Sequence, residues 1–248
     1  MFEWLGGVLD AWLNIFLQPS PWGTVYLGLL FQGLAITFFV ALVTWAIAFV
    51  LGSLIGIART LPYKPLRFVT TAYVEIFRSV PLLVQLFLWF FVVPELLPQA
   101  WGTWIKNLES GSMLTAIIGL GCFTSVRIAE QVRAAILSIS LGMKNASTAL
   151  GMTRAQTYRY ILLPMGYRIM LPPLTSEFLN NLKNTSTIFT IGVMDLMGRT
   201  SEMMEFTFKA YEPLFFATFC YLIINLLVVC AARFLEGMAA IPGFNAAR

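Results

Sequence analysis

Charged residues inside apolar stretches are the features of this sequence whose types and spacing could do chemistry. Glu75 and Arg78 lie three residues apart, so on a helix they share one face and can form an ion pair. A charge without a partner at the centre of a bilayer costs about 2.5–3.5 kcal/mol on insertion scales. We therefore interpret this pair either as a support of its own helix or as part of an inner gate or subunit contact. Arg127, Glu130 and Arg133 repeat the spacing, and we expect them to anchor the structure.

Residues 165–194 mix apolar side chains with many polar ones. The polar residues and prolines include Pro172, Pro173, Thr175, Ser176, Glu177, Asn180, Asn181, Lys183, Asn184, Thr185, Ser186 and Thr187. A polar or broken helix cannot face lipid along its whole length, so it lines a cavity or lies against protein. We predict that this segment lines a polar pathway, with Lys183, Asn184 and Thr185 as candidate lining residues. Lys183 and Arg78 are candidates to attract an anion. The alternative is a helix that packs inside an oligomer through polar contacts.

The composition excludes several classes of enzyme site. The chain has no histidine, which excludes Ser-His-Asp and Cys-His nucleophilic sites and metals or haem held by histidine. Cys122, Cys220 and Cys230 lie in apolar stretches without a C-x-x-C motif, and we expect no metal site or disulfide. There is no G-x-x-x-x-G-K-[ST] phosphate loop, so we expect no cofactor in this chain and no ATP hydrolysis of that kind.

The elements that position these residues are membrane helices. Of 248 residues, 58% are hydrophobic and 11% charged, whereas a soluble domain carries about 25% charged residues. No Asp, Glu, Lys or Arg occurs from Ala11 to Ala58, a run far longer than the roughly 20 residues that cross a bilayer. The sequence therefore predicts an all-α integral membrane protein, a single transmembrane domain over residues 1–248. We expect about five spans, at residues 27–57, 68–93, 113–137, 165–194 and 213–232.

Basic residues in the connecting segments predict the orientation. Short cytoplasmic loops carry the excess of Lys and Arg. One side of the five-span arrangement holds Arg59, Lys64, Arg67, Lys144, Arg154, Arg159, Arg168, Arg233 and Arg248, and the other holds Lys106, Arg199 and Lys209. We therefore predict an external N-terminus and a cytoplasmic C-terminus. Because the basic residues follow this topological pattern, the net charge of +4 does not indicate binding of nucleic acid. No cleavable signal peptide is expected, because the first basic residue is Arg59.

Residues 142–164, expected in the cytoplasm, predict two short helices joined by a bend. Gly151 suits the position just after a helix, where a positive φ costs a glycine nothing. Thr153 and Gln156 have the spacing of a capping box that starts a new helix, and we expect that helix to stop at Pro164. The segment can be a passive connection, a DNA-binding helix-turn-helix or a docking element for a cytoplasmic partner. A DNA-binding domain is disfavoured, because the segment lacks the third helix and the core that such a domain needs.

The third interpretation agrees with a resemblance to a known family. Gly142–Gly151, followed by Ile161–Pro164, resembles the EAA loop of ATP-binding-cassette importer permeases. The wider chain, about residues 27–232, resembles the polar amino-acid permeases of that class. Three further motifs carry this likeness: Tyr73–Gln85, Ala129–Arg133 and Leu182–Ser186. The family often has Gln, Glu and Ala where this chain has Met143, Asn145 and Ser147. A residue other than Glu at the middle position is also found in permeases for acidic amino acids, which makes glutamate and aspartate the leading substrates.

The resemblance implies a type I importer permease fold in the bacterial cytoplasmic (inner) membrane, crossing it several times. It implies that residues 142–164, the coupling loop, contact the ATPase through Asn145, Ala146, Ser147, Gly151 and Pro164. The expected partners are a cytoplasmic ATPase dimer that uses the ATP, a second permease subunit (the same chain or another), an external amino-acid-binding protein and membrane lipid, but no nucleic acid. The chain itself is then a transport subunit and not an enzyme.

Two other classes compete with this prediction. A stand-alone secondary transporter or channel for a small polar solute would use an ion gradient and no ATPase. Five spans without a paired repeat argue against it. A membrane enzyme is disfavoured, because the chain shows no clear pair of nucleophile and base.

Overall fold

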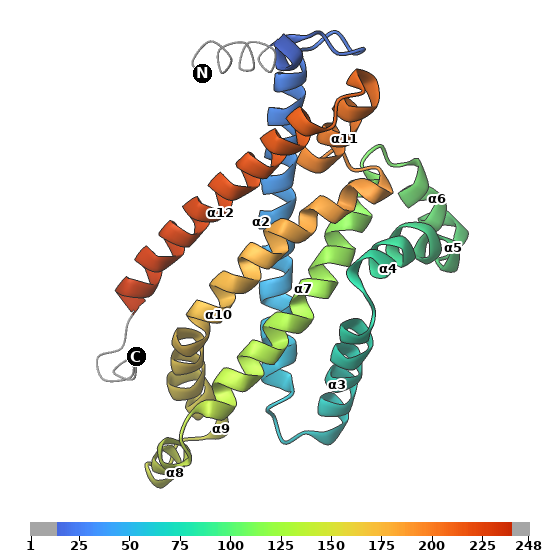
Figure 1. The fold of residues 1–248 in the computed structure, drawn as a ribbon. Helices are drawn as coiled ribbons and strands as arrows, with labels where there is room; N and C mark the ends of the chain where they lie inside the picture. Colours follow the sequence, from blue (N-terminus) through green and yellow to red (C-terminus); the bar gives the residue numbers. More distant parts are fainter. Residues whose placement is uncertain (1–13, 240–248) are drawn as a thin grey trace.

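The computed structural model describes residues 14–239 as one set of packed helices (Figure 1). Four long helices make up most of it: α2 (Tyr26–Ala58), α7 (Gly111–Ser138), α10 (Leu163–Asn184) and α12 (Tyr211–Ala239). α7 packs against both α2 and α10, and α12 lies at the edge of the set, beside α10 (Figure 1). The all-helical class that the sequence predicts is confirmed over the described residues.

Shorter elements connect these helices. Between α2 and α7 lie α3 (Lys64–Ser79), α4 (Leu82–Phe87), the π-helical segment η1 (Leu88–Val92), α5 (Val93–Leu96) and α6 (Gln99–Asn107). From α7 to α10 the chain passes through α8 (Leu141–Ala149), α9 (Arg154–Thr157) and the π-helical segment η2 (Tyr158–Leu162). From α10 to α12 it passes through the 3-10 segment η3 (Thr185–Ile191) and α11 (Leu196–Thr207).

The close approach of α2 to α7 depends on two glycines four residues apart. A Cβ atom at Gly52 would lie 2.6 Å from the carbonyl oxygen of Ser125, and one at Gly56 would lie 2.7 Å from that of Ala129. Small residues at this spacing let two membrane helices approach until their backbones almost touch. The side chain of Ile128 then fills the space beside Gly52. This contact fixes how the last two turns of α2 pack against the middle of α7.

Within residues 14–239, three helices are long and apolar enough to cross a membrane: α2, α7 and residues Tyr211–Phe234 of α12. The predicted spans 27–57, 113–137 and 213–232 lie within them. The predicted span 68–93 is not a single helix, because α3 and residues Leu82–Leu96 are bent by 107° with respect to each other. The predicted span 165–194 covers most of α10 and all of η3. These two segments carry many polar residues and are not among the three apolar helices. The count of five spans stays a prediction.

Prolines explain why two helices contain π-helical turns. In an α-helix, Pro94 and Pro164 would clash with the carbonyl groups of Phe90 and Tyr160, four residues earlier. Each of those residues lies in a π-helical segment that ends two residues before the proline. There the amides of Val93 and Leu163 bond to carbonyl groups five residues earlier, which shifts the register and makes room for the ring. The expectation that the helix after Thr153 stops at Pro164 is therefore wrong: it continues into α10.

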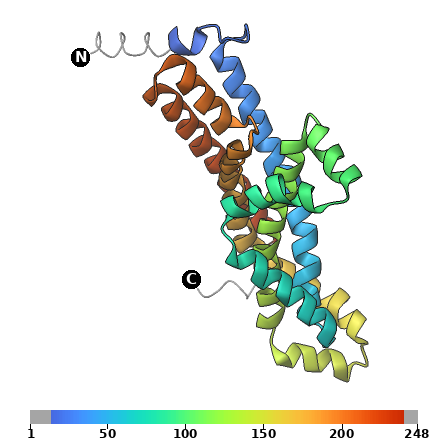
Figure 2. The ribbon, with the colours of Figure 1, turned by 90° about the vertical axis from the view of Figure 1, so that its right-hand side faces the viewer.

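The two ends of the bundle carry different segments. α2 ends, α3 begins and α8 and α9 turn at one end, drawn at the bottom of Figure 1, while α11 and the start of α12 lie at the other (Figures 1 and 2). Arg59, Lys64 and Lys144 therefore share one end, as the predicted orientation requires. Arg248, which the same count used, lies outside the described residues.

Candidate functional site

The bend at Gly151 follows from backbone hydrogen bonding at the end of α8. Gly151 has φ +73°, and its amide donates to the carbonyl of Thr148 at 3.0 Å. The amide of Met152 donates to the carbonyl of Ser147 at 3.1 Å, which completes the pair of bonds of a Schellman motif. The predicted positive φ at Gly151 is confirmed, and it turns the chain sharply between α8 and α9.

The capping box that starts α9 is also confirmed. The backbone amide of Gln156 donates to the hydroxyl oxygen of Thr153 at 3.3 Å, and the amide of Thr153 donates to the side-chain oxygen of Gln156 at 2.8 Å. The hydroxyl of Thr157 donates to that of Ser147 at 3.2 Å. Since Ser147 is buried, this bond joins the two short helices and fixes the angle between them.

The coupling loop presents an exposed surface made of both polar and apolar residues. Asn145, Ala146 and Gly151 are exposed, whereas Ser147 faces inward. Around them Leu141 is 74% and Leu150 is 80% exposed. Large apolar side chains exposed together mark protein contact sites more often than solvated loops. Pro164, the fifth residue predicted for this site, is exposed but lies on the continuous helix, past the two short helices.

The coupling loop is bonded to the bundle through Tyr158. Its hydroxyl donates to the carbonyl of Thr60 at 3.2 Å and lies 3.0 Å from the Thr60 hydroxyl. Thr60 follows the end of α2, next to Arg59, whose buried guanidinium forms a 2.7 Å ion pair with Glu130 on α7. Arg133 lies 3.7 Å from the same carboxylate. Sequence spacing indicated the contact between Glu130 and Arg133 but missed the shorter one to Arg59, because that pair is 71 residues apart.

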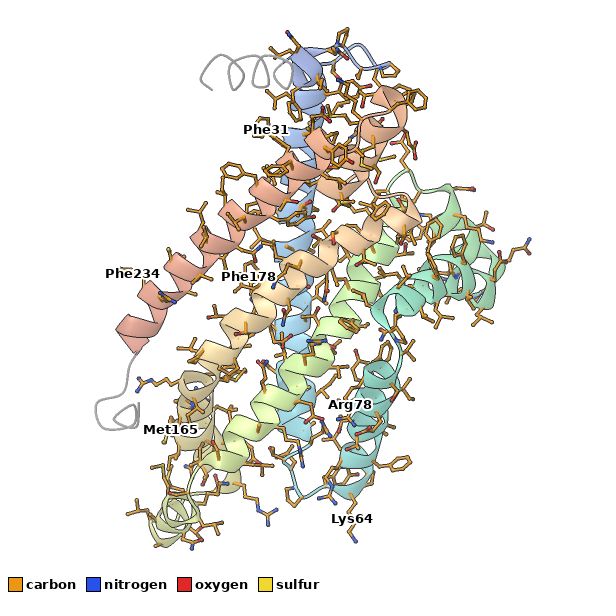
Figure 3. The ribbon with its side chains drawn as sticks, viewed as in Figure 1. Phe31, Lys64, Arg78, Met165, Phe178 and Phe234 are labelled. Atoms are coloured by element: carbon orange, nitrogen blue, oxygen red, sulfur yellow. The ribbon has the colours of Figure 1, made fainter. Side chains whose placement is uncertain are left out.

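The predicted pair of Glu75 and Arg78 forms on α3. Their side chains are 2.7 Å apart, and each is about half exposed. Figure 3 places Lys64 at the lower end of α3 and Arg78 further up the same helix, towards the bend that precedes α4. The half-exposed pair supports its helix only weakly, since surface ion pairs contribute about 0.2–1 kcal/mol. Its role as a gate stays a prediction.

Asn181 on α10 joins three helices. Its amide nitrogen donates to the carbonyl of Ala41 at 2.9 Å and to the hydroxyl of Thr44 at 3.0 Å, both on α2. Its oxygen accepts from the hydroxyl of Thr124 on α7 at 3.0 Å. Asn181 is fully buried, so its polarity serves contacts between helices and not an open pathway.

A more accessible polar face of α10 lies beside α7. Glu177 forms an ion pair with Arg127 of α7 at 3.7 Å, and the arginine is 47% exposed. Asn184, seven residues after Glu177 and so on the same side of the helix, is half-buried. Lys183 is exposed, whereas Thr185 is buried and its hydroxyl donates to the carbonyl of Leu182 at 2.7 Å. The structure thus brings Lys183 and Asn184 to a surface, but not Thr185.

Comparison with known proteins places this geometry in a family. The family model described as "Binding-protein-dependent transport system inner membrane component" matches residues 48–237, which include both the coupling loop and the polar face of α10. The chain belongs to this family. It is therefore the membrane-spanning permease component of a transport system in the inner membrane that works with a separate binding protein and, in an ATP-binding-cassette system, with a separate ATPase.

Individual relatives match nearly the whole permease. It is 42% identical over 236 residues to the glutamate/aspartate import permease protein GltJ of Escherichia coli (strain K12), covering 93% of this chain and 95% of that protein. It is 31% identical over 200 residues to the probable glutamine ABC transporter permease protein GlnM of Bacillus subtilis (strain 168), covering 81% of this chain and 88% of the relative.

A solved structure shares the fold of the permease. It is described as the crystal structure of an amino acid ABC transporter with histidines, and the two superimpose with a TM-score of 0.75 at 26% identity. The match covers 86% of this chain and 95% of the other. The type I importer permease fold that the resemblance implied is confirmed.

Proposed function

We propose that this permease forms part of the pathway through which an importer carries glutamate and aspartate into the cell. The relative with 42% identity over nearly the full length is named for these two substrates. An acidic amino acid carries a net negative charge, so a pathway that admits it benefits from cations along its wall. Lys183 is exposed, and Arg127 is half exposed despite its contact with Glu177. These two side chains are the cations that we assign to the pathway.

The proposal depends most on the continuous helix that runs from the coupling loop to Lys183. α9, η2, α10 and η3 follow one another without a break from Arg154 to Ile191. A force applied at α8 and α9 is therefore transmitted along one helix to Lys183 and Asn184. The bond between Tyr158 and Thr60 carries the same motion to the end of α2. This geometry supports coupling of ATP hydrolysis to opening of the pathway.

We propose the following partners for this permease. Two cytoplasmic ATPase subunits would dock on the exposed surface of the coupling loop, with Asn145 and Ala146 at its centre and Leu141 and Leu150 beside them. A second permease, either another copy of this chain or a related one, would complete the pathway. The external binding protein would deliver the amino acid. ATP would be used by the ATPase, and this chain would need no cofactor of its own.

The proposal is tested by substrate competition in proteoliposomes that contain the permease, its ATPase and its binding protein. Unlabelled aspartate should compete with labelled glutamate for uptake, and glutamine should not. Lys183→Gln should raise the KM for glutamate about tenfold, because a hydrogen bond to a charged partner contributes about 1.5–3 kcal/mol. Lys64→Gln, an exposed lysine at the opposite end of the bundle, is the control and should have no effect. Equal competition by glutamine, or an unchanged KM in Lys183→Gln, would contradict the proposal.

A further inference from the structure

The bend between α3 and α4 leaves backbone groups without their helical partners. α3 ends at Ser79, Val80 is extended with φ −102° and ψ 127°, and α4 begins at Leu82 after Pro81. Pro81 has no amide hydrogen, so the carbonyl of Phe77, four residues earlier, cannot be satisfied as in a regular helix. The extended conformation of Val80 also removes its own carbonyl from any helical pattern. Both carbonyl groups belong to the residues next to the 107° bend.

The side chain of Gln85 supplies what Pro81 lacks. Its amide nitrogen donates to the carbonyl of Phe77 at 2.6 Å and to the carbonyl of Val80 at 2.9 Å. Both partners are acceptors, so only the NH₂ end of the amide can lie there, and the orientation of the group is determined. Gln85 is 3% exposed, and its own oxygen has no hydrogen-bond partner among the described residues. The two hydrogen bonds that the amide nitrogen donates therefore compensate the burial of this polar side chain.

Both arms of the bend pack against α7, at different levels along it, and the second arm also packs against η3. On α3, Val74 is buried with Val126 and Ala129 of α7, and the Tyr73 hydroxyl lies 3.0 Å from that of Ser125. On α4, Leu86 is buried in another cluster that includes Ile188 of η3. The first arm carries the pair of Glu75 and Arg78, and the second packs against the segment that follows Lys183 and Asn184. The angle at Pro81 therefore sets how these two groups lie relative to each other.

We propose that Gln85 is a positioning residue for transport: its amide replaces the missing Pro81 amide and holds α3 and α4 at the angle that transport requires. Gln85 acts through the backbone and does not need to touch the substrate. The inference uses the proposed import of amino acids only for its activity readout. The angle itself can be measured independently of any substrate.

The test measures the angle and transport in the same complexes. Nitroxide labels at Phe68 on α3 and Leu96 on α5, both exposed, report the bend by electron–electron resonance after Cys122, Cys220 and Cys230 are replaced. Gln85→Met keeps the length of the side chain but removes both bonds. Leu86→Met is the matched control, since it changes packing at the adjacent buried position and removes no hydrogen bond.

We expect Gln85→Met to broaden or shift the distance distribution and to lower uptake about tenfold, because two buried carbonyl groups lose their partners. Leu86→Met should leave both unchanged. Pro81→Ala combined with Gln85→Met restores a backbone amide for the carbonyl of Phe77, so the angle in this double variant should open. Its label distance should rise above the wild-type value, towards the roughly 42 Å of 28 helical residues as an upper limit, with uptake still low. The double variant also covers the case in which Gln85→Met alone does not fold.

Three results would overturn the inference. The first is a wild-type distance and uptake in Gln85→Met. The second is full uptake in the double variant although its label distance has changed. The third is an equal loss in Leu86→Met, which would indicate packing. A wrong substrate assignment can be distinguished from a wrong role of Gln85. In that case the wild-type complex would not import glutamate, but the label distances would still respond to Gln85→Met as expected. Stimulation of the ATPase by the loaded binding protein would then replace uptake as the readout.

Discussion

Gly151 is the residue on which the shape of the coupling loop depends most directly. A residue with a Cβ atom at φ +73° costs roughly 1 kcal/mol, and a β-branched one costs more. No atom lies within 4 Å of a Cβ placed there, so the effect of a substitution is conformational and not steric. We expect Gly151→Val to reach the membrane normally, to import almost nothing, and to lose stimulation of the ATPase by the loaded binding protein. Uptake and ATPase activity of the purified complex are measured side by side.

Gly142 is the matched control for this prediction. It lies inside α8, the helix that Gly151 follows, also has open space at its Cβ position, and does not have a positive φ. Gly142→Ala should therefore keep full uptake. Wild-type uptake by Gly151→Val would show that the coupling loop is a passive connection.

Single residues were predictable where the signal is local. Three features depend only on residues that lie close together in the sequence, and all three form. They are the bend at Gly151, the capping box of Thr153 and Gln156, and the pair of Glu75 and Arg78. The sequence did not predict that Arg59 pairs with Glu130. It also did not predict that Asn181 bonds to Thr44 and Thr124. Their contacts join different helices, and nothing in one helix specifies which polar group lies opposite on the next. The close contact of α2 and α7 did have a readable signal, the spacing of Gly52 and Gly56.

At the scale of elements, α10 combines an anchored side with an accessible one. Asn181→Leu removes bonds to α2 and α7 and leaves the buried hydroxyl of Thr124 without its partner, at about 1–3 kcal/mol. We expect a clear loss of thermal stability, measured as the temperature at which the purified complex stops eluting as a single species. Asn180→Leu, on the same helix at a half-buried position, should shift this temperature little. An equal shift in both variants would contradict the assigned role of Asn181.

The elements were predicted less well where prolines occur. Pro164 was expected to end a helix, but the π-helical turn of η2 accommodates it, and the helix continues for more than 20 residues. Pro81 lies within the predicted span 68–93, where the structure has two helices bent by 107° with respect to each other. A proline removes the same hydrogen bond in both places. The outcome depends on whether a π-helical turn or a side chain such as Gln85 satisfies the freed carbonyl, and the sequence alone does not specify which.

At the scale of the whole molecule, the orientation in the membrane remains to be measured. The segments after α2 and around α8 lie at one end of the bundle and carry most of the basic loop residues, which the cytoplasmic side attracts. We expect a reporter fused after Arg248 to be cytoplasmic and one inserted near Thr103 to be external. Paired reporters that are active on opposite sides of the membrane check this. Activity with the reverse sidedness would contradict the five-span topology.

We propose that this permease couples ATP hydrolysis by a partner to import of acidic amino acids through the coupling loop. Uptake of labelled glutamate into proteoliposomes that contain the permease, the ATPase and the binding protein tests this coupling. We expect uptake that requires ATP and all three components, that Gly151→Val abolishes and that Gly142→Ala leaves unchanged. Uptake that continues without the ATPase under an ion gradient, or unchanged uptake in Gly151→Val, would contradict it.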